Sequence, residues 1–137
     1  MEWAKPVSDK QALARAVIEI YINNVKLVQA LSKSYGFKCL FYWQPVIYQK
    51  RQLTDYEGRA IELKHNYAGM KEFYAETYAV MQTRAEESLE RDLALRDISS
   101  IFDQVREPIY IDYCHIGEKG NSMVAGVMVE DFMRLTK

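Results

Sequence analysis

The sequence has no long apolar run, no excess of one charge and too few cysteines for a disulfide framework. Its 18 Lys and Arg nearly balance its 19 Asp and Glu, which leaves a net charge of −1. A protein that binds nucleic acid through its overall electric field is therefore not expected. Apolar runs such as 40–43 are far shorter than the roughly 20 residues that a membrane-spanning helix needs. The first six residues also lack the pattern of a secretory signal.

The two cysteines, Cys39 and Cys114, fit a reducing compartment. We interpret both as small buried apolar residues. As far as the chain shows, a cytoplasmic location is compatible with this composition, but the sequence does not assign one. Its 137 residues, of which 49% are hydrophobic, indicate one folded domain at most.

The first part of the chain predicts a long helix that ends at a glycine. Ser8 is expected to cap this helix, with Gln11 three residues later as the reciprocal partner. Gly36 is the expected end, because glycine adopts the left-handed conformation at little cost. Apolar residues recur at helical spacing, interrupted only by Asn24, and predict one broad buried face: Leu13, Val17, Ile20, Leu27, Val28 and Leu31.

A nearly unbroken apolar run, 37–43, follows directly and predicts a strand that is covered on both faces. A helix, a glycine and such a strand form the second half of a βαβ unit, so we expect a parallel sheet. The next loop is polar, and Lys50 and Arg51 are interpreted as solvated side chains.

A second long helix is predicted over 54–83. Thr54 and Glu57 have the spacing of a capping box, and Gly69 is a point where the helix can bend or divide. The charge-rich stretch 84–97 is expected to be helical and solvated.

The remaining third of the chain predicts a loop, a strand and a helix. The loop 98–108 should bury the pair Ile101 and Phe102, and 109–111 should form a short strand. The inner face of a last helix is expected at Val124, Ala125, Met128, Phe132 and Leu135. The predicted fold is therefore α/β, with two parallel strands joined by the helix 54–83.

The residues most suggestive of chemistry are Asp112 and His115, which directly follow the predicted strand 109–111. A carboxylate and an imidazole at this spacing can meet across a tight turn. The carboxylate then fixes the proton on one ring nitrogen and leaves the other nitrogen as a base. The carboxyl end of a parallel strand is also where open α/β sheets hold ligands. A structural hydrogen bond is the alternative interpretation.

These residues resemble the last motif of SGNH (GDSL-type) esterases and hydrolases, D-x-x-H, which precedes a glycine-containing loop and a helix with small residues. Here the motif is followed by Gly120, Asn121 and Ala125. Further upstream, a second stretch is similar to one that bacterial members carry before that motif, and it comprises Phe41 to Pro45, Lys50, Leu53, Thr54 and Glu57. The resemblance extends from about Leu13 to Leu135.

The resemblance implies that residues 1–137 form a single partial domain, the C-terminal part of a flavodoxin-like three-layer α/β/α fold with an incomplete sheet. It implies that His115 is the general base and Asp112 its orienting partner in ester hydrolysis, without a cofactor or a metal. The family's nucleophile is a serine in a Gly-Asp-Ser motif, and this sequence has no such motif. The chain is therefore expected to be inactive alone and to act on a small-molecule ester only in a full-length form.

Two other interpretations remain open. The chain could be a non-catalytic remnant whose tyrosine-rich helix covers a partner. A metal site that combines His65, His115 and carboxylates is less favoured, because the spacing of these residues is not that of a ligand set. If the sheet is incomplete, as the resemblance implies, strand 37–43 has an open edge, which predicts self-association or pairing with a missing N-terminal half.

Overall fold

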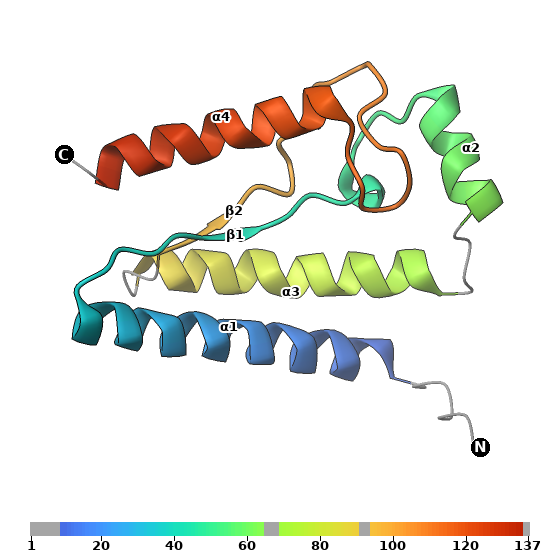
Figure 1. Cartoon of the computed structure of the whole chain (residues 1–137). Coiled ribbons are helices and arrows are strands. Elements are labelled where there is room, and N and C mark those ends of the chain that lie inside the picture. Colours follow the sequence, from blue (N-terminus) through green and yellow to red (C-terminus); the bar gives the residue numbers. More distant parts are fainter. Residues whose placement is uncertain (1–8, 65–68, 91–93, 136–137) are drawn as a thin grey trace, which may run out of the picture. The chain divides into compact units, whose positions relative to one another are not determined.

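The computed structural model describes residues 9–64, 69–90 and 94–135. This part of the chain is mixed α/β and mostly helical, with a small two-stranded sheet (Figure 1). Its helices and strands follow in the order α1 (Lys10–Tyr35), β1 (Phe41–Trp43), the short 3₁₀ helix η1 (Ile47–Gln49), α2 (Asp55–Lys64), α3 (Met70–Glu90), β2 (Leu95–Asp97) and α4 (Glu118–Leu135). These elements belong to two compact units: the first comprises 1–41 and 68–95, and the second comprises 42–67 and 96–137.

The first unit is built from α1 and α3, which lie side by side and run in the same direction (Figure 1). Two ion pairs join these helices. Lys10 lies 3.8 Å from Glu72, and Arg84 pairs with Glu19. The buried apolar residues of this unit are Ala14, Ile18, Ile22, Val25, Tyr78, Met81 and Leu95.

The ends of α1 follow the expected capping chemistry with one change. The Asp9 side chain caps the helix by accepting a 2.9 Å hydrogen bond from the amide of Ala12. The predicted cap, Ser8, lies outside the described residues. Gly36 ends the helix at a φ of 72°, as predicted, and its amide donates to the carbonyl of Ser32.

The predicted buried face of α1 is wrong. Val17, Ile20, Leu27 and Leu31 are exposed, whereas Ala14, Ile18, Ile22 and Val25 are buried. Both sets recur at helical spacing, so the periodicity of the sequence does not distinguish the face that α3 covers from the other one.

The sheet contains β1 and β2 in a parallel arrangement. The Phe41 amide donates to the Ala94 carbonyl at 2.8 Å, and the Ile98 amide donates to the Trp43 carbonyl at 3.1 Å. The strand predicted over 37–43 is thus confirmed for its last three residues only. These are half-buried rather than covered on both faces.

The second strand of the sheet is not the predicted one. Residues 109–111 lie outside the sheet, and Tyr110 instead forms an isolated antiparallel bridge with Ile116. The strand that pairs with β1 lies in the stretch 84–97, which was predicted to be helical and solvated. That stretch is helical as far as Glu90, but Leu95 is buried in β2.

The helix predicted over 54–83 is divided at Gly69, which adopts a φ of 82°. Its first part is α2, and the capping box at its start is confirmed. The Thr54 amide donates to Glu57 Oε2 at 2.9 Å, and the Glu57 amide donates to Thr54 Oγ1 at 3.3 Å.

A small apolar core fills the second unit. It consists of Ile47, Phe102, Ile109 and Tyr110. The predicted burial of the pair 101–102 is confirmed for Phe102, whereas Ile101 is only half-buried against this core. The rings of Phe102 and Tyr110 meet edge to face at a centroid distance of 5.6 Å. The predicted inner face of α4 is only partly right, because Val124 and Leu135 are half-buried but Ala125, Met128 and Phe132 are exposed.

Candidate functional site

The loop that carries Asp112 and His115 is closed by backbone hydrogen bonds on both sides. The Ile111 amide donates to the His115 carbonyl at 2.9 Å, and the Gly117 amide donates to the Ile109 carbonyl at 2.8 Å. The bridge between Tyr110 and Ile116 lies between these two bonds. Residues 111–115 are therefore held as a short loop on a two-stranded stem.

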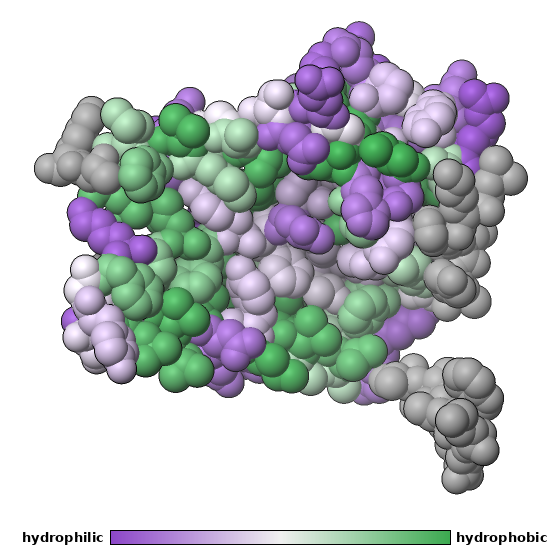
Figure 2. Space-filling view, in the orientation of Figure 1, coloured by the Kyte–Doolittle hydropathy of each residue, from purple (hydrophilic) through white to green (hydrophobic). Residues whose placement is uncertain are grey.

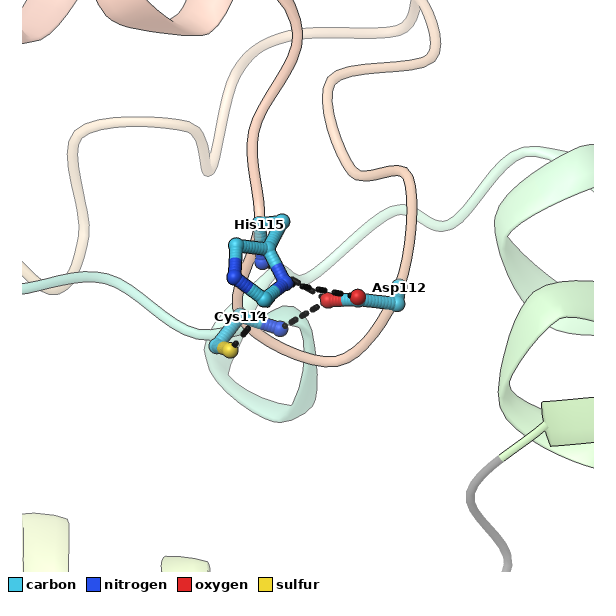
Figure 3. Close-up of side chains that lie close together, drawn as sticks. All are labelled: Asp112, Cys114 and His115. Carbon is cyan, nitrogen blue, oxygen red and sulfur yellow. Dashed lines mark hydrogen bonds and ion pairs between the residues drawn. The ribbon is translucent and has the colours of Figure 1, made fainter.

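Asp112 organises the inside of this loop. One carboxylate oxygen, Oδ1, accepts hydrogen bonds from the amides of Cys114 at 3.0 Å and His115 at 2.8 Å. The other oxygen, Oδ2, lies 2.7 Å from His115 Nδ1 (Figure 3). Partial burial by itself would raise the pKa of Asp112, but these three hydrogen bonds outweigh it and hold the pKa well below its ordinary value.

This geometry determines the tautomer of the neutral imidazole. An ionised carboxylate can only accept a hydrogen bond, so Nδ1 carries the hydrogen and Nε2 keeps its lone pair. Figure 3 shows the second ring nitrogen on the side of the ring that faces away from Asp112. The His115 side chain is largely exposed, whereas that of Asp112 is mostly buried. The pair can therefore act as a base that is accessible from solvent.

His115 also borders an open pocket of about 510 Å³ in the second unit. That volume lies in the range of small-molecule sites. Its lining is mainly apolar with a few polar groups: Tyr42, Gln44, Pro45, Ile98, Cys114, His115, Ile116, Asn121, Val124 and Met128. Among the described residues, those that line this pocket include no serine and no threonine.

One wall of the pocket is fixed by a polar cluster on Asp131 of α4. Tyr42 donates a 3.0 Å hydrogen bond to Asp131 Oδ2, and Arg96 pairs with Oδ1 of the same carboxylate. Desolvation, followed by the hydrogen bond to Asp131, raises the pKa of Tyr42 to about 12. The phenol is therefore neutral at physiological pH and links β1 to α4.

A buried ion pair supports the other end of the loop. Lys50 Nζ lies 2.7 Å from Glu57 Oε2, and both side chains are fully buried. Glu57 Oε1 accepts hydrogen bonds from the amides of Ile109 at 2.9 Å and Tyr110 at 3.2 Å, two residues before Asp112. The prediction that Lys50 is a solvated loop residue is wrong. The capping box did identify Glu57, but nothing in that motif indicated its contacts with residues 109 and 110.

Gly120 allows α4 to begin directly against the stem of the loop. A Cβ atom at this position would lie 2.8 Å from Ile109 Cγ2 and 3.0 Å from Ile116 Cβ. Asn121 follows it and donates from Nδ2 to the Ile116 carbonyl at 3.4 Å. The glycine and asparagine after the D-x-x-H motif are thus packing and bonding residues of the same loop.

The loop also brings together three possible metal ligands. One ligand atom each of Asp112, Cys114 and His115 lies within 4.8 Å of the others. Both carboxylate oxygens, however, already accept hydrogen bonds within the loop. A metal at Nδ1 would have to replace the bond between Asp112 and His115. His65, the second histidine of the predicted metal set, lies outside the described residues.

Cys114 is a side chain with nucleophilic chemistry beside the ring, and its Sγ lies 3.8 Å from His115 Nδ1. Desolvation, opposed only in part by a hydrogen bond from Tyr113, raises the pKa of the Cys114 thiol, and the charge of Asp112 raises it further. Because the thiolate is the reactive form, Cys114 is not activated as a nucleophile.

Comparisons of the chain with protein-family models, with curated proteins and with solved structures find no match. Within the described residues, no helix is both long and apolar enough to cross a membrane. The geometry of the loop and its pocket is therefore the basis on which a function can be argued.

Proposed function

We propose that Asp112 and His115 are the orienting carboxylate and the general base of an ester-hydrolysing site. The nucleophile of this site is a serine that does not belong to the residues lining the pocket. In this proposal the chain is the C-terminal part of an SGNH-type hydrolase domain. The observation that carries the proposal is the 2.7 Å contact between Asp112 Oδ2 and His115 Nδ1 beside an open pocket.

The chemistry follows from the tautomer that Asp112 imposes. Nε2 of His115 removes the proton of the serine hydroxyl as the oxygen attacks the ester carbonyl. Asp112 stabilises the imidazolium that results, which then returns the proton to the departing alcohol. Water hydrolyses the acyl-serine by the same route, with His115 again acting as the base.

The pocket supports a small ester as the substrate class. Ile98, Ile116 and Val124 offer apolar surface for an acyl or alcohol chain. Gln44 and Asn121 are two of the uncharged polar side chains of the lining, and such groups orient a ligand in a mainly apolar site.

By its resemblance to the SGNH family, the proposed site still needs a nucleophile and an oxyanion hole. The catalytic serine of that family and its oxyanion-hole residues belong to motifs that this sequence lacks. Donors aimed at the developing oxyanion supply a large part of the rate in acyl transfer. We therefore expect the isolated chain to show no enzyme-like turnover.

The first experiment measures hydrolysis of 4-nitrophenyl butyrate by the purified chain. The expected rate does not exceed that of free imidazole at the same concentration, and it falls in His115→Ala but not in His65→Ala. Turnover at an enzyme-like rate that His115→Ala abolishes would show that the nucleophile is present in this chain, and would refute that part of the proposal.

The second experiment tests the base itself in the assembled protein. The tagged chain is purified from its native cells and treated with a fluorophosphonate probe, which labels activated serines. We expect a labelled serine whose labelling is lost with His115→Ala and Asp112→Ala and retained with Glu130→Gln. If His115→Ala does not change the labelling, or if no serine is labelled, the non-catalytic interpretation of the chain is favoured.

A further inference from the structure

The exposed apolar side chains of α1 follow a repeat that its contact with α3 does not explain. Successive members lie four, three, four, three and four residues apart, and they are Leu13, Val17, Ile20, Asn24, Leu27 and Leu31. This alternation is the 3.5-residue repeat with which two helices pack along one another in a coiled coil. We refer to these six residues as the α1 seam.

Most of the α1 seam is open to solvent. Ile20 is 63% exposed and Leu27 60%, and Val17, Asn24 and Leu31 are also exposed. Figure 2 shows apolar surface over α1. Because α3 covers a different set of α1 residues, the helix has two apolar faces, and only one of them is buried. An exposed stripe of large aliphatic residues on a folded helix is typical of a protein contact.

Asn24 indicates which partner packs against the α1 seam. In heptad terms Val17, Asn24 and Leu31 occupy a positions, and Leu13, Ile20 and Leu27 occupy d positions. In a parallel pair in register, each a residue meets the same residue of the partner, so two Asn24 amides can bond to each other. Any shifted register places Asn24 against an aliphatic side chain. A lone a-position asparagine specifies register and a two-stranded state in this way.

The residues at the g positions beside the α1 seam offer no charge that would attract a charged partner. The flanking g positions are Ala16, Asn23 and Ala30, which carry no charge, and the small alanines let a second helix approach closely. A second copy of α1 therefore meets no opposing charge at these positions. Symmetric pairs of identical chains are also the commonest oligomers of soluble proteins.

We propose that this protein forms a parallel homodimer through α1, in which the α1 seams of two copies pack in register around Asn24. The α1 seam spans fewer than three heptads, which is too short for two isolated helical peptides to form a stable coiled coil. Here α1 is already folded against α3, so association does not have to form the helix. The small size of the seam predicts a dissociation constant of about micromolar order.

Sedimentation equilibrium of the full chain tests this proposal. We expect a monomer–dimer equilibrium in which Leu27→Asp raises the dissociation constant about tenfold or more. The matched control is Phe132→Asp on α4, because Phe132 is 59% exposed and the same charge is introduced there. A chain that stays monomeric at all concentrations would overturn the proposal. Equal weakening by Phe132→Asp would also overturn it, since association would then use α4.

Cysteine cross-linking tests the register and does not depend on a disruptive substitution. Val17→Cys, which keeps Asn24, should form a disulfide-linked dimer under mild oxidation, because equivalent a positions face each other. Lys26→Cys, which lies off the seam, should show only the background of Cys39 and Cys114. Absence of extra cross-linking in Val17→Cys would exclude the in-register parallel pair, even if a dimer is present.

Discussion

Lys50 and Glu57 form an ion pair that has no exposed side-chain surface, with Lys50 Nζ at 2.7 Å from Glu57 Oε2. Glu57 also accepts hydrogen bonds from Thr54 and from the amides of Ile109 and Tyr110. Lys50 in turn donates to the Glu107 carbonyl at 2.8 Å. One carboxylate thus ties the start of α2 to the stem of the loop that holds Asp112 and His115.

Replacing Glu57 by glutamine should destabilise the chain severely. The change leaves the Lys50 ammonium buried without its counter-charge, and breaking a buried pair from one side costs about 3–5 kcal/mol. Urea unfolding followed by circular dichroism measures the loss. The matched control is Glu130→Gln in an exposed ion pair with Arg134, for which we expect a change within about 0.5 kcal/mol. Equal effects of the two substitutions would contradict the role assigned to Glu57.

The contribution of Glu57 should depend on pH in a defined direction. Burial alone would raise the pKa of Glu57, but the hydrogen bonds from Lys50, Thr54, Ile109 and Tyr110 hold it below its ordinary value of 4.5. A lowered folded-state pKa gives stability that is present above the unfolded-state pKa and lost as the pH falls through the folded-state value. The free-energy gap between wild type and Glu57→Gln should therefore be widest near neutral pH and narrow below about pH 4. A gap that is constant with pH would contradict this assignment.

Several local features could be predicted because neighbouring residues determine them. Gly36 ends α1, Thr54 and Glu57 form the capping box, and Asp112 meets His115 across the turn. Each of these depends on chemistry within four residues. The spacing of the chain is then enough to predict the contact.

The misplaced strand and the misassigned face of α1 have a different cause. In β2, Leu95 is buried while Arg96 points to Asp131, so a single apolar residue marks the strand in a charged stretch. The apolar residues at 109–111 predict a strand equally well, but they pair with the chain that returns at Ile116. Partner choice is a long-range property, and the local pattern does not contain it.

The burial of Lys50 also depends on long-range contacts and could not be predicted from the local sequence. A lysine in a polar loop is normally solvated, and its burial depends on a carboxylate seven residues later and on a carbonyl at residue 107. The candidate pair could thus be found from sequence, whereas the buried pair that supports its loop could not.

Replacing Asp112 by asparagine should reverse the tautomer of the neutral His115 ring. The carboxylate can only accept the hydrogen of Nδ1, whereas an amide can donate its own hydrogen to Nδ1 and leave the proton on Nε2. Long-range ¹⁵N NMR in alkaline buffer distinguishes the two tautomers, and His65→Ala assigns the signals. We expect the ratio of tautomers to change about tenfold or more. An unchanged ratio would mean that Asp112 does not orient the ring.

Replacing Asn24, the polar residue of the α1 seam, should strengthen association of the chains. It should also make the number of chains that associate less specific. Asn24→Val replaces the amide with a β-branched side chain that packs well at an a position. We expect a lower dissociation constant together with species larger than the dimer in sedimentation velocity. Lys26→Val, which introduces the same side chain off the seam, should leave the association state unchanged. If both variants behave alike, general hydrophobicity rather than the seam controls association.

Two glycines of α4 allow a matched test of how tightly this helix packs against the stem of the loop. A Cβ atom at Gly120 would approach Ile109 and Ile116 at 2.8 and 3.0 Å, whereas nothing lies within 4 Å of one at Gly126. Gly120→Ala should therefore destabilise the chain by about 1–3 kcal/mol through overpacking. Gly126→Ala should stabilise it by up to about 1 kcal/mol, because alanine favours the helix. Urea unfolding measures both changes, and the NMR signals of His115 should shift in Gly120→Ala only. Stabilisation by both substitutions would show that α4 does not pack tightly against the stem of the loop.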